Sequence, residues 1–518
     1  MPRHPRAATP LVVVDNSLDA PLWRQIYDQL RDAIVSGRLA TGTKLPASRV
    51  LGKDLVVSRN SVNAAYEQLR AEGYLEQRQR LGSFVASVIP DVAARPQSRP
   101  VDVPEARAAA QLQKPPQAQQ PPQRHANLSS TGAVFVRAAE RLSQSRQLSD
   151  WATPLAFRIG DPATDAFPLA LWSRLVARRW RTGQVPLGYS DPAGAIELRR
   201  AIAEYLNTSR GVRCEPEQVF IASGTQQALD LAMRLVLSPG DPVWVENPGY
   251  PGARSAVEGA GATVVPVSVD DEGLSVEHGI RLCPNARGVY VTPSHQFPLG
   301  AVMSVTRRLA LLRWAAEADA WIFEDDYDSE FRYASRPLPS LQGLDEHGRV
   351  IYTGTFSKTL FPALRLAYVV SPPSLVDAFQ AACILGGRYA PTDGQLVVTD
   401  FINEGHFERH LRRMRALYAS RQHALLDCVR DFLADSLDVA PSAAGLHLVA
   451  WLKDPQFDAR QVSARAADAG VEIPPLANYT FTPMDRDGFL MGYGAYEPNV
   501  MRTAALRLAT VLRKMAAR

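Results

Sequence analysis

The sequence is poor in cysteine. Its four cysteines, among 518 residues, are scattered at Cys214, Cys283, Cys383 and Cys428, and no two form a CxxC pair. This spacing argues against a disulfide framework and against a zinc site, so we expect no bound metal. Because thiols stay reduced in the cytoplasm, we expect the protein to be cytoplasmic.

Long apolar runs are missing as well. The short run from Leu11 to Val14 ends at Asp15, well below the roughly 7–15 apolar residues of a signal peptide. No stretch approaches the ~18 uninterrupted apolar residues that a membrane helix needs. We therefore expect neither export nor a membrane partner.

An excess of one charge sign is nearly absent. The formal net charge of +4 is too small over this length to make the whole chain a nucleic-acid binder. Residues 1–88 hold 12 Lys and Arg against 8 Asp and Glu, so most of the basic excess lies near the N-terminus.

Large apolar residues almost disappear between Ser87 and Leu128, where Pro, Gln and Ala dominate. Such a stretch cannot bury enough surface to offset its ordering entropy, so we expect a mobile linker. The linker separates the chain into an N-terminal part and a C-terminal part. The predicted parts are an N-terminal tail (1–19), a compact unit (20–87), the linker (88–127), a large domain (128–394) and a small C-terminal domain (395–518).

The compact unit is predicted to contain three helices and a hairpin. Apolar residues recur at helical spacing over 22–34 and predict a first helix. Two more helices are predicted after Ser48 and Ser58, whose hydroxyls are suited to cap a helix N-terminus. Alternating residues over 74–78, a turn, and a short strand over 83–85 predict a small hairpin.

Helix, turn, helix and a basic hairpin are the layout of a winged helix-turn-helix, whose second helix enters the major groove of DNA. Polar residues that open this helix can reach base edges, and basic residues around it can hold phosphates. A small helical module with a solvated charged face is the alternative. On the DNA-binding interpretation, a double-stranded operator is contacted by Lys44, Arg49, Ser58, Arg59, Asn60, Ser61, Arg78 and Arg80.

After the linker, short apolar segments alternate with helical ones up to about Gly394. This rhythm predicts an α/β fold with a sheet covered on both faces. Beyond it, one long helix over 395–430, mixed short elements and a closing helix over 499–517 predict a smaller α+β domain. The predicted strands are 219–222, 242–245, 263–267, 288–291, 321–324, 350–352 and 367–370, with helices such as 226–237 and 306–318 between them.

Several polar residues stand directly after these strands. They are Lys358 in TGTFSK, Asp325 in EDDYD, Gly224 and Thr225 in SGTQ, and Tyr250 in ENPGY. Singly, each has a plain interpretation: a solvated lysine, an acidic cap or metal site, a helix cap, and a turn tyrosine. Together they meet the needs of a pyridoxal 5′-phosphate (PLP) site, which are a Schiff-base amine, a carboxylate for the pyridine nitrogen, phosphate donors and an aromatic face.

The motifs resemble a known combination. LPASRVLGKDLVVSRNSVNAAYEQLRAEGYLEQRQRLGSFV, residues 45–85, resembles the GntR-type winged helix. The order SGTQ, ENPGY, TPSHQFPLG, EDDYDSEFRY, TGTFSKTLFPALRLAY resembles the fold type I aminotransferases. Their fusion is similar to the MocR/GabR family of transcription regulators.

The resemblance implies a homodimer and a role for each site residue. Lys358 would form the Schiff base with PLP, Asp325 would pair with the pyridine nitrogen, Tyr327 would hydrogen-bond the ring O3′, and Tyr250 would stack on the ring. The phosphate would be held by Gly224, Thr225, Thr355 and Arg365, with Tyr189 reaching the phosphate of the neighbouring subunit.

Two positions depart from the aminotransferase pattern. Phe297, in QFPLG, stands where these enzymes usually have an Asn, and Leu490 stands where they usually have the Arg that clamps the substrate α-carboxylate. Three hypotheses follow: a regulator that senses PLP or an amine or amino-acid effector, a working aminotransferase that also binds DNA, and a regulator whose second domain only dimerises. The departures favour the first, with partial or vestigial transaminase chemistry at most.

Overall fold

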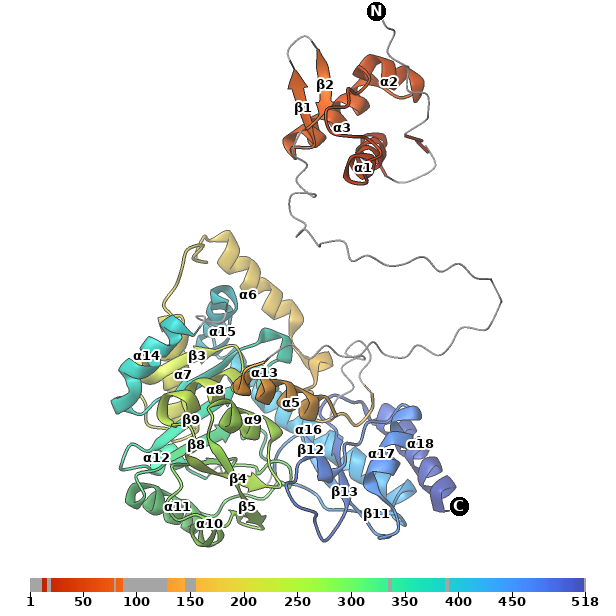
Figure 1. Cartoon of the computed structure of the whole chain (residues 1–518). Coiled ribbons are helices and arrows are strands. Elements are labelled where there is room, and N and C mark those ends of the chain that lie inside the picture. Colours follow the sequence, from red (N-terminus) through yellow and green to blue (C-terminus); the bar gives the residue numbers. More distant parts are fainter. Residues whose placement is uncertain are drawn as a thin grey trace, which may run out of the picture. The chain divides into compact units, whose positions relative to one another are not determined.

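The computed structural model describes residues 12–15, 20–78, 81–86, 128–144, 155–333, 338–386 and 391–516. The chain divides into two compact units, one within residues 1–121 and the other within 122–518 (Figure 1). The predicted linker and Arg80 lie outside the described residues.

The first unit has the predicted helices and hairpin. Its elements are α1 (Leu22–Val35), α2 (Ser48–Asp54), α3 (Arg59–Ala71), β1 (Leu75–Arg78) and β2 (Gly82–Val85). The two strands pair antiparallel beside α3 (Figure 1), with Leu75 opposite Val85. Ile26, Val62 and Leu69 are fully buried between the helices, because their helical spacing places them on inward faces.

One of the two predicted caps is confirmed and the other is wrong. The Ser58 hydroxyl accepts a hydrogen bond from the Ser61 backbone N–H at 3.1 Å and so caps α3. Ser48 is already the first residue of α2, and Ala47 takes the capping position without a side-chain bond. A cap needs extended backbone, which Ala47 has, so Ser48 falls inside the helix.

The second unit is built on an eight-stranded sheet in the order β3-β10-β9-β8-β7-β4-β5-β6. Strands β4, β5, β7, β8 and β9 run parallel, whereas β10 is antiparallel to both of its neighbours and β6 to β5. The seven predicted strands are confirmed, and several extend further than predicted. The strands are β3 (Val219–Ala222), β4 (Pro242–Asn247), β5 (Thr263–Asp270), β6 (Gly273–Leu274), β7 (Gly288–Val291), β8 (Trp321–Asp326), β9 (Val350–Thr355) and β10 (Ala367–Val370).

Helices cover both faces of this sheet, as predicted. Neighbouring residues of β4 show it: Val243 and Val245 pack into one buried cluster and Trp244 into another. The helices up to the end of this sheet region are α5 (Ser130–Gln144), α6 (Leu169–Arg181), α7 (Ile196–Ser209), α8 (Thr225–Val236), α9 (Pro251–Gly259), α10 (Val276–Leu282), α11 (Val305–Glu317), α12 (Leu341–Leu344), α13 (Phe356–Thr359) and α14 (Val376–Leu385).

The single long helix predicted over 395–430 is wrong. The structure has two helices there, α15 (Thr392–Asn403) and α16 (His406–Phe432). Gly405 between them has φ of 69°, a left-handed conformation that ends one helix and starts the next.

The chain ends in a small sheet and two helices. β11 (Leu437–Val439), β12 (His447–Leu452) and β13 (Gly488–Gly492) form a three-stranded antiparallel sheet. The helices are α17 (Ala459–Asp468) and the closing α18 (Pro498–Ala516), which was predicted. No described helix is long and apolar enough to cross a membrane.

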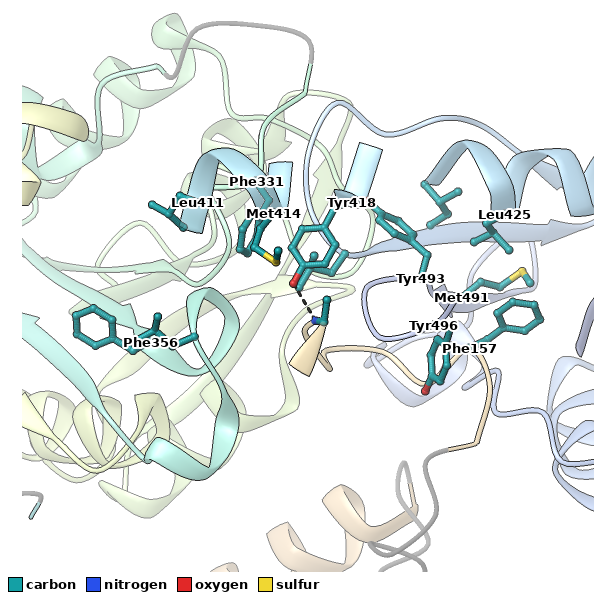
Figure 2. Packing of buried hydrophobic residues seen from close by; sticks show 14 of the residues in the cluster. Phe157, Phe331, Phe356, Leu411, Met414, Tyr418, Leu425, Met491, Tyr493 and Tyr496 are labelled. Atoms are coloured by element: carbon teal, nitrogen blue, oxygen red, sulfur yellow. Dashed lines mark hydrogen bonds between the residues drawn. The ribbon is translucent and has the colours of Figure 1, made fainter. Parts of the chain in front are cut away.

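One hydrophobic core connects these parts to the short helix α13, which carries Lys358. Phe356 on α13, Tyr418 on α16 and Met491 on β13 belong to the same buried cluster (Figure 2). The Tyr418 hydroxyl also accepts a hydrogen bond from the Ala163 backbone N–H at 2.9 Å. The short α13 is therefore anchored in the interior two residues before Lys358.

Candidate functional site

The start of α8 forms a cradle suited to an anion. Gly224 and Thr225 open this helix directly after β3, so backbone N–H groups lie at a positive helix end. A Cβ on Gly224 would lie 3.1 Å from Nη2 of Arg365, which shows how closely the guanidinium approaches the glycine backbone. Thr355, at the end of β9, caps α13 by accepting from the Ser357 N–H at 3.1 Å. A phosphate would find a helix terminus and a bidentate cation together.

Lys358 reaches across the unit. Its Nζ donates a hydrogen bond to the Gly160 carbonyl at 2.6 Å, between residues 198 positions apart in the sequence. A Cβ on Gly160 would lie 2.9 Å from this nitrogen. The glycine therefore leaves room for the amine at this point, which the sequence pattern did not reveal.

Asp325 is a buried carboxylate with one unsatisfied oxygen. Its side chain sits at the end of β8, with the residue 4% exposed, and Oδ2 accepts from the Tyr290 hydroxyl at 2.8 Å. Oδ1 has no hydrogen-bond partner within the described part of the chain. The Thr353 hydroxyl donates to the Glu324 carbonyl at 3.2 Å, and it also lies close enough to Asp325 to oppose part of the rise in the pKa of that carboxyl group. Burial raises the pKa of Asp325 to about 7.

Orphaned acceptors are uncommon in a protein interior, and Oδ1 of Asp326 and Oδ1 of Asp328 are further ones among the described residues of this region. A protonated pyridine nitrogen would supply both the donor and the positive charge. With the cradle of α8 and the amine of Lys358, the residues present fit PLP.

Tyr327 belongs to a small polar network that the sequence analysis missed. The Tyr327 hydroxyl lies 2.9 Å from Nδ1 of His295, and the same nitrogen lies 3.0 Å from Oδ2 of Asp328. A carboxylate only accepts, so we assign the Nδ1 proton to the bond with Asp328. The Tyr327 proton is then left to another acceptor, as a contact with O3′ of PLP requires. His295 lies in the TPSHQFPLG motif, and this motif was the sequence feature that could have pointed to a role for the histidine.

Glycines hold His295 in place. A Cβ on Gly445 would lie 2.1 Å from Cε1 of His295, and one on Gly300 would lie 3.2 Å from Nε2. Both glycines have left-handed φ values of 88° and 81°. The imidazole is thus fixed by backbone on both sides, which orients its contact with Tyr327.

Two further residues predicted to contact the cofactor, Tyr250 and Tyr189, lie in loops that precede helices. Tyr250 precedes α9, with its ring centroid 6.0 Å from that of Phe297 and 6.5 Å from that of Tyr290. Tyr189 is 89% exposed in the loop before α7, and its contact with a second subunit stays a prediction. Phe297 packs against the buried cluster that contains Leu490.

The predicted DNA contacts lie mainly at the start of α3. Arg59 and Asn60 are exposed in its first turn, and Ser61 is half-buried. Arg49 is exposed on α2. In the hairpin, Arg78 forms an ion pair with Glu76 at 2.5 Å, and its guanidinium lies 4.7 Å from the centre of the Phe84 ring. Arg78 must therefore share its charge with Glu76 if it also holds a phosphate.

Known proteins match both units. Residues 22–85 match the gntR family of bacterial regulatory proteins, and residues 158–484 match aminotransferases of class I and II. The probable rhizopine catabolism regulatory protein MocR of Rhizobium meliloti is 42% identical over 494 residues, which cover 95% of this chain and 94% of that protein. The uncharacterized HTH-type transcriptional regulator YhdI of Bacillus subtilis (strain 168) is 34% identical, with 96% and 97% covered.

Among solved structures, the second unit is similar to LysN, the α-aminoadipate aminotransferase of Thermus thermophilus. The TM-score is 0.67 at 29% sequence identity, and the match covers 75% of this chain and 100% of that chain. LysN was solved in complex with N-(5′-phosphopyridoxyl)-L-leucine.

Proposed function

The chain belongs to the MocR family of transcription regulators, in which a GntR-type winged helix is fused to an aminotransferase-like domain, and from this we propose that it binds PLP and regulates its operator in response to PLP or to an amine or amino-acid effector. Asp325 carries the proposal, because its buried Oδ1 lacks a donor at the place where the pyridine nitrogen of PLP would lie. Bound PLP supplies an aldehyde that captures amines and a ring that withdraws electrons.

Each residue of the site has a part in this proposal. Arg365 and the start of α8 would hold the phosphate, and Lys358 would hold the cofactor covalently through its amine. Tyr327, oriented by His295, would donate to O3′. Tyr250 would lie against the ring.

Regulation requires that effector binding favour one arrangement of the winged helices over another. We propose that the chain acts as a homodimer, in which the exposed Tyr189 loop meets the partner's phosphate site. Two winged helices on one dimer would then meet two operator half-sites, whose spacing the effector state changes.

The test compares the full-length protein with Lys358→Ala. The wild type is expected to take up PLP as an absorbing adduct that borohydride makes permanent, and Lys358→Ala is expected to lose that adduct while staying folded. Lys453→Ala, an exposed lysine of the same unit, is the matched control and should behave as wild type. A borohydride-stable adduct that persists in Lys358→Ala would contradict the assignment.

A working aminotransferase is the second candidate, favoured by the presence of both Lys358 and Asp325. Incubation of the PLP-loaded protein with an amino donor and a keto acid separates the two functions. Sustained formation of new keto acid would favour the enzyme. An operator affinity that changes with amine, without keto-acid release, would favour the regulator.

A further inference from the structure

The two positions that depart from the aminotransferase pattern lie in one apolar cluster. Leu476, Tyr479 and Leu490 are its buried members, and Ile159, Phe297 and Leu299 are among those packed against it. Leu490 is 0% exposed, whereas Ile159 and Phe297 are only half-buried. We call Ile159, Phe297, Tyr479 and Leu490 the apolar wall.

The apolar wall borders the candidate PLP site. The Phe297 ring centroid lies 6.2 Å from that of Tyr327, 6.0 Å from that of Tyr250 and 5.3 Å from that of Tyr479. Ile159 directly precedes Gly160, whose carbonyl accepts from Lys358 Nζ. A small molecule whose nitrogen lies near Lys358 would therefore place its substituents against these side chains.

Two basic groups beside this wall, Arg158 and His447, already have partners. Arg158, next to Ile159, forms an ion pair with Glu472 at 2.7 Å. His447, whose ring lies 5.7 Å from that of Phe297, is close to the Pro298 carbonyl at 3.0 Å, and burial lowers its pKa to about 4. At neutral pH this imidazole is uncharged, so it offers a carboxylate no ion pair.

We propose that the effector is a primary amine with an apolar or aromatic substituent and no carboxylate on the carbon that bears the nitrogen. An apolar group gains free energy when it leaves water for this wall, whereas a carboxylate buried there loses hydration without a compensating cation. The inference rests on the proposed function, because it takes PLP at Lys358 as the group that meets the amine.

Matched ligand pairs test it on the PLP-loaded, full-length wild type. Phenethylamine and L-phenylalanine differ only by the carboxylate, as do isopentylamine and L-leucine. Binding is followed by the absorbance of bound PLP and, independently, by the Tm of the protein. Each amine is expected to bind at least tenfold more tightly than its amino acid. Equal affinity, or tighter binding of the amino acids, overturns the inference.

A variant tests the wall itself. Leu490→Arg introduces a cation at the deepest position and is expected to shift the preference of each pair toward the amino acid by at least tenfold. Leu490→Met keeps the volume and apolar character and should keep the preference for amines. If Leu490→Arg fails to fold, Phe297→Asn, at a half-buried position, replaces it as the test variant. It is expected to weaken the binding of phenethylamine more than the binding of isopentylamine. An unchanged ratio in a folded Leu490→Arg variant overturns the role of the wall.

The outcomes separate this inference from the proposed function. A protein that takes up no PLP overturns both. A protein that takes up PLP at Lys358 but prefers the amino acids overturns only the effector class and leaves the PLP-binding regulator standing.

Discussion

Replacing Asp325 by Asn should have opposite effects on the stability of the PLP-free protein and on its affinity for PLP. Burial raises the pKa of Asp325 from its ordinary 3.8 to about 7. Because the folded-state pKa is the higher one, the carboxyl group stabilises the fold fully at pH below about 4. That contribution is lost as the pH rises to about 7, since the unfolded chain ionises more readily.

The size of the effect follows from the shift. About three pKa units, at about 1.4 kcal/mol each, correspond to roughly 4 kcal/mol at most. Roughly 3 kcal/mol of this falls between pH 5 and pH 8. Asn has no proton to lose, so the PLP-free Asp325→Asn protein should gain stability over wild type by about this amount across that interval.

Bound PLP should reverse the advantage. A protonated pyridine nitrogen would stabilise the Asp325 anion, and the variant would lose a charge-assisted hydrogen bond worth about 1.5–3 kcal/mol. The affinity for PLP should fall roughly ten- to 150-fold.

Urea unfolding at pH 5 and pH 8, and titration with PLP followed by absorbance, measure the two effects. Glu324→Gln is the matched control, because Glu324 is the preceding residue in β8, is fully buried and also has its pKa raised to about 7. Its carboxylate accepts from the backbone N–H groups of Leu341 and Gln342, so Glu324→Gln should leave the PLP affinity unchanged. The reasoning is refuted if the stability difference between Asp325→Asn and wild type is the same at both pH values, or if the variant binds PLP as tightly as wild type.

Two further changes test the other parts of the molecule. Arg59→Ala should weaken operator binding by about 1–3 kcal/mol in gel-shift titrations, as expected for a base contact. Arg70→Ala, in the last turn of α3, should have little effect. Equal losses of affinity in the two variants would show that the start of α3 does not contact the bases. Gly445→Ala should push the His295 ring away and cost about 1–3 kcal/mol in unfolding experiments, with weaker PLP binding measured by absorbance; Gly348→Ala, also at left-handed φ but with no atom within 4 Å, should leave PLP binding intact.

Local patterns predicted much of the fold because they act over a few residues. The Ser58 cap depends on one hydroxyl and a backbone N–H three residues on, and the strand segments each carry their own apolar run. Prediction failed where two local signals compete. Apolar periodicity continues through the region of Gly405, and a single glycine costs a helix only about 1 kcal/mol, so the break was not visible before the packing of α15 and α16 was known.

For the site, the sequence by itself named the candidate residues: Lys358 and Asp325 follow strands, and the resemblance to fold type I aminotransferases added Tyr327 and Arg365. Only the tertiary structure decided what surrounds them. Tyr290 meets Asp325 across 35 residues, and Lys358 meets Gly160 across 198. Leu490 and Phe297 join one wall although they are far apart in the chain. Periodicity and capping carry no information over such separations, since the packing of the sheet and the paths of its loops bring these side chains together.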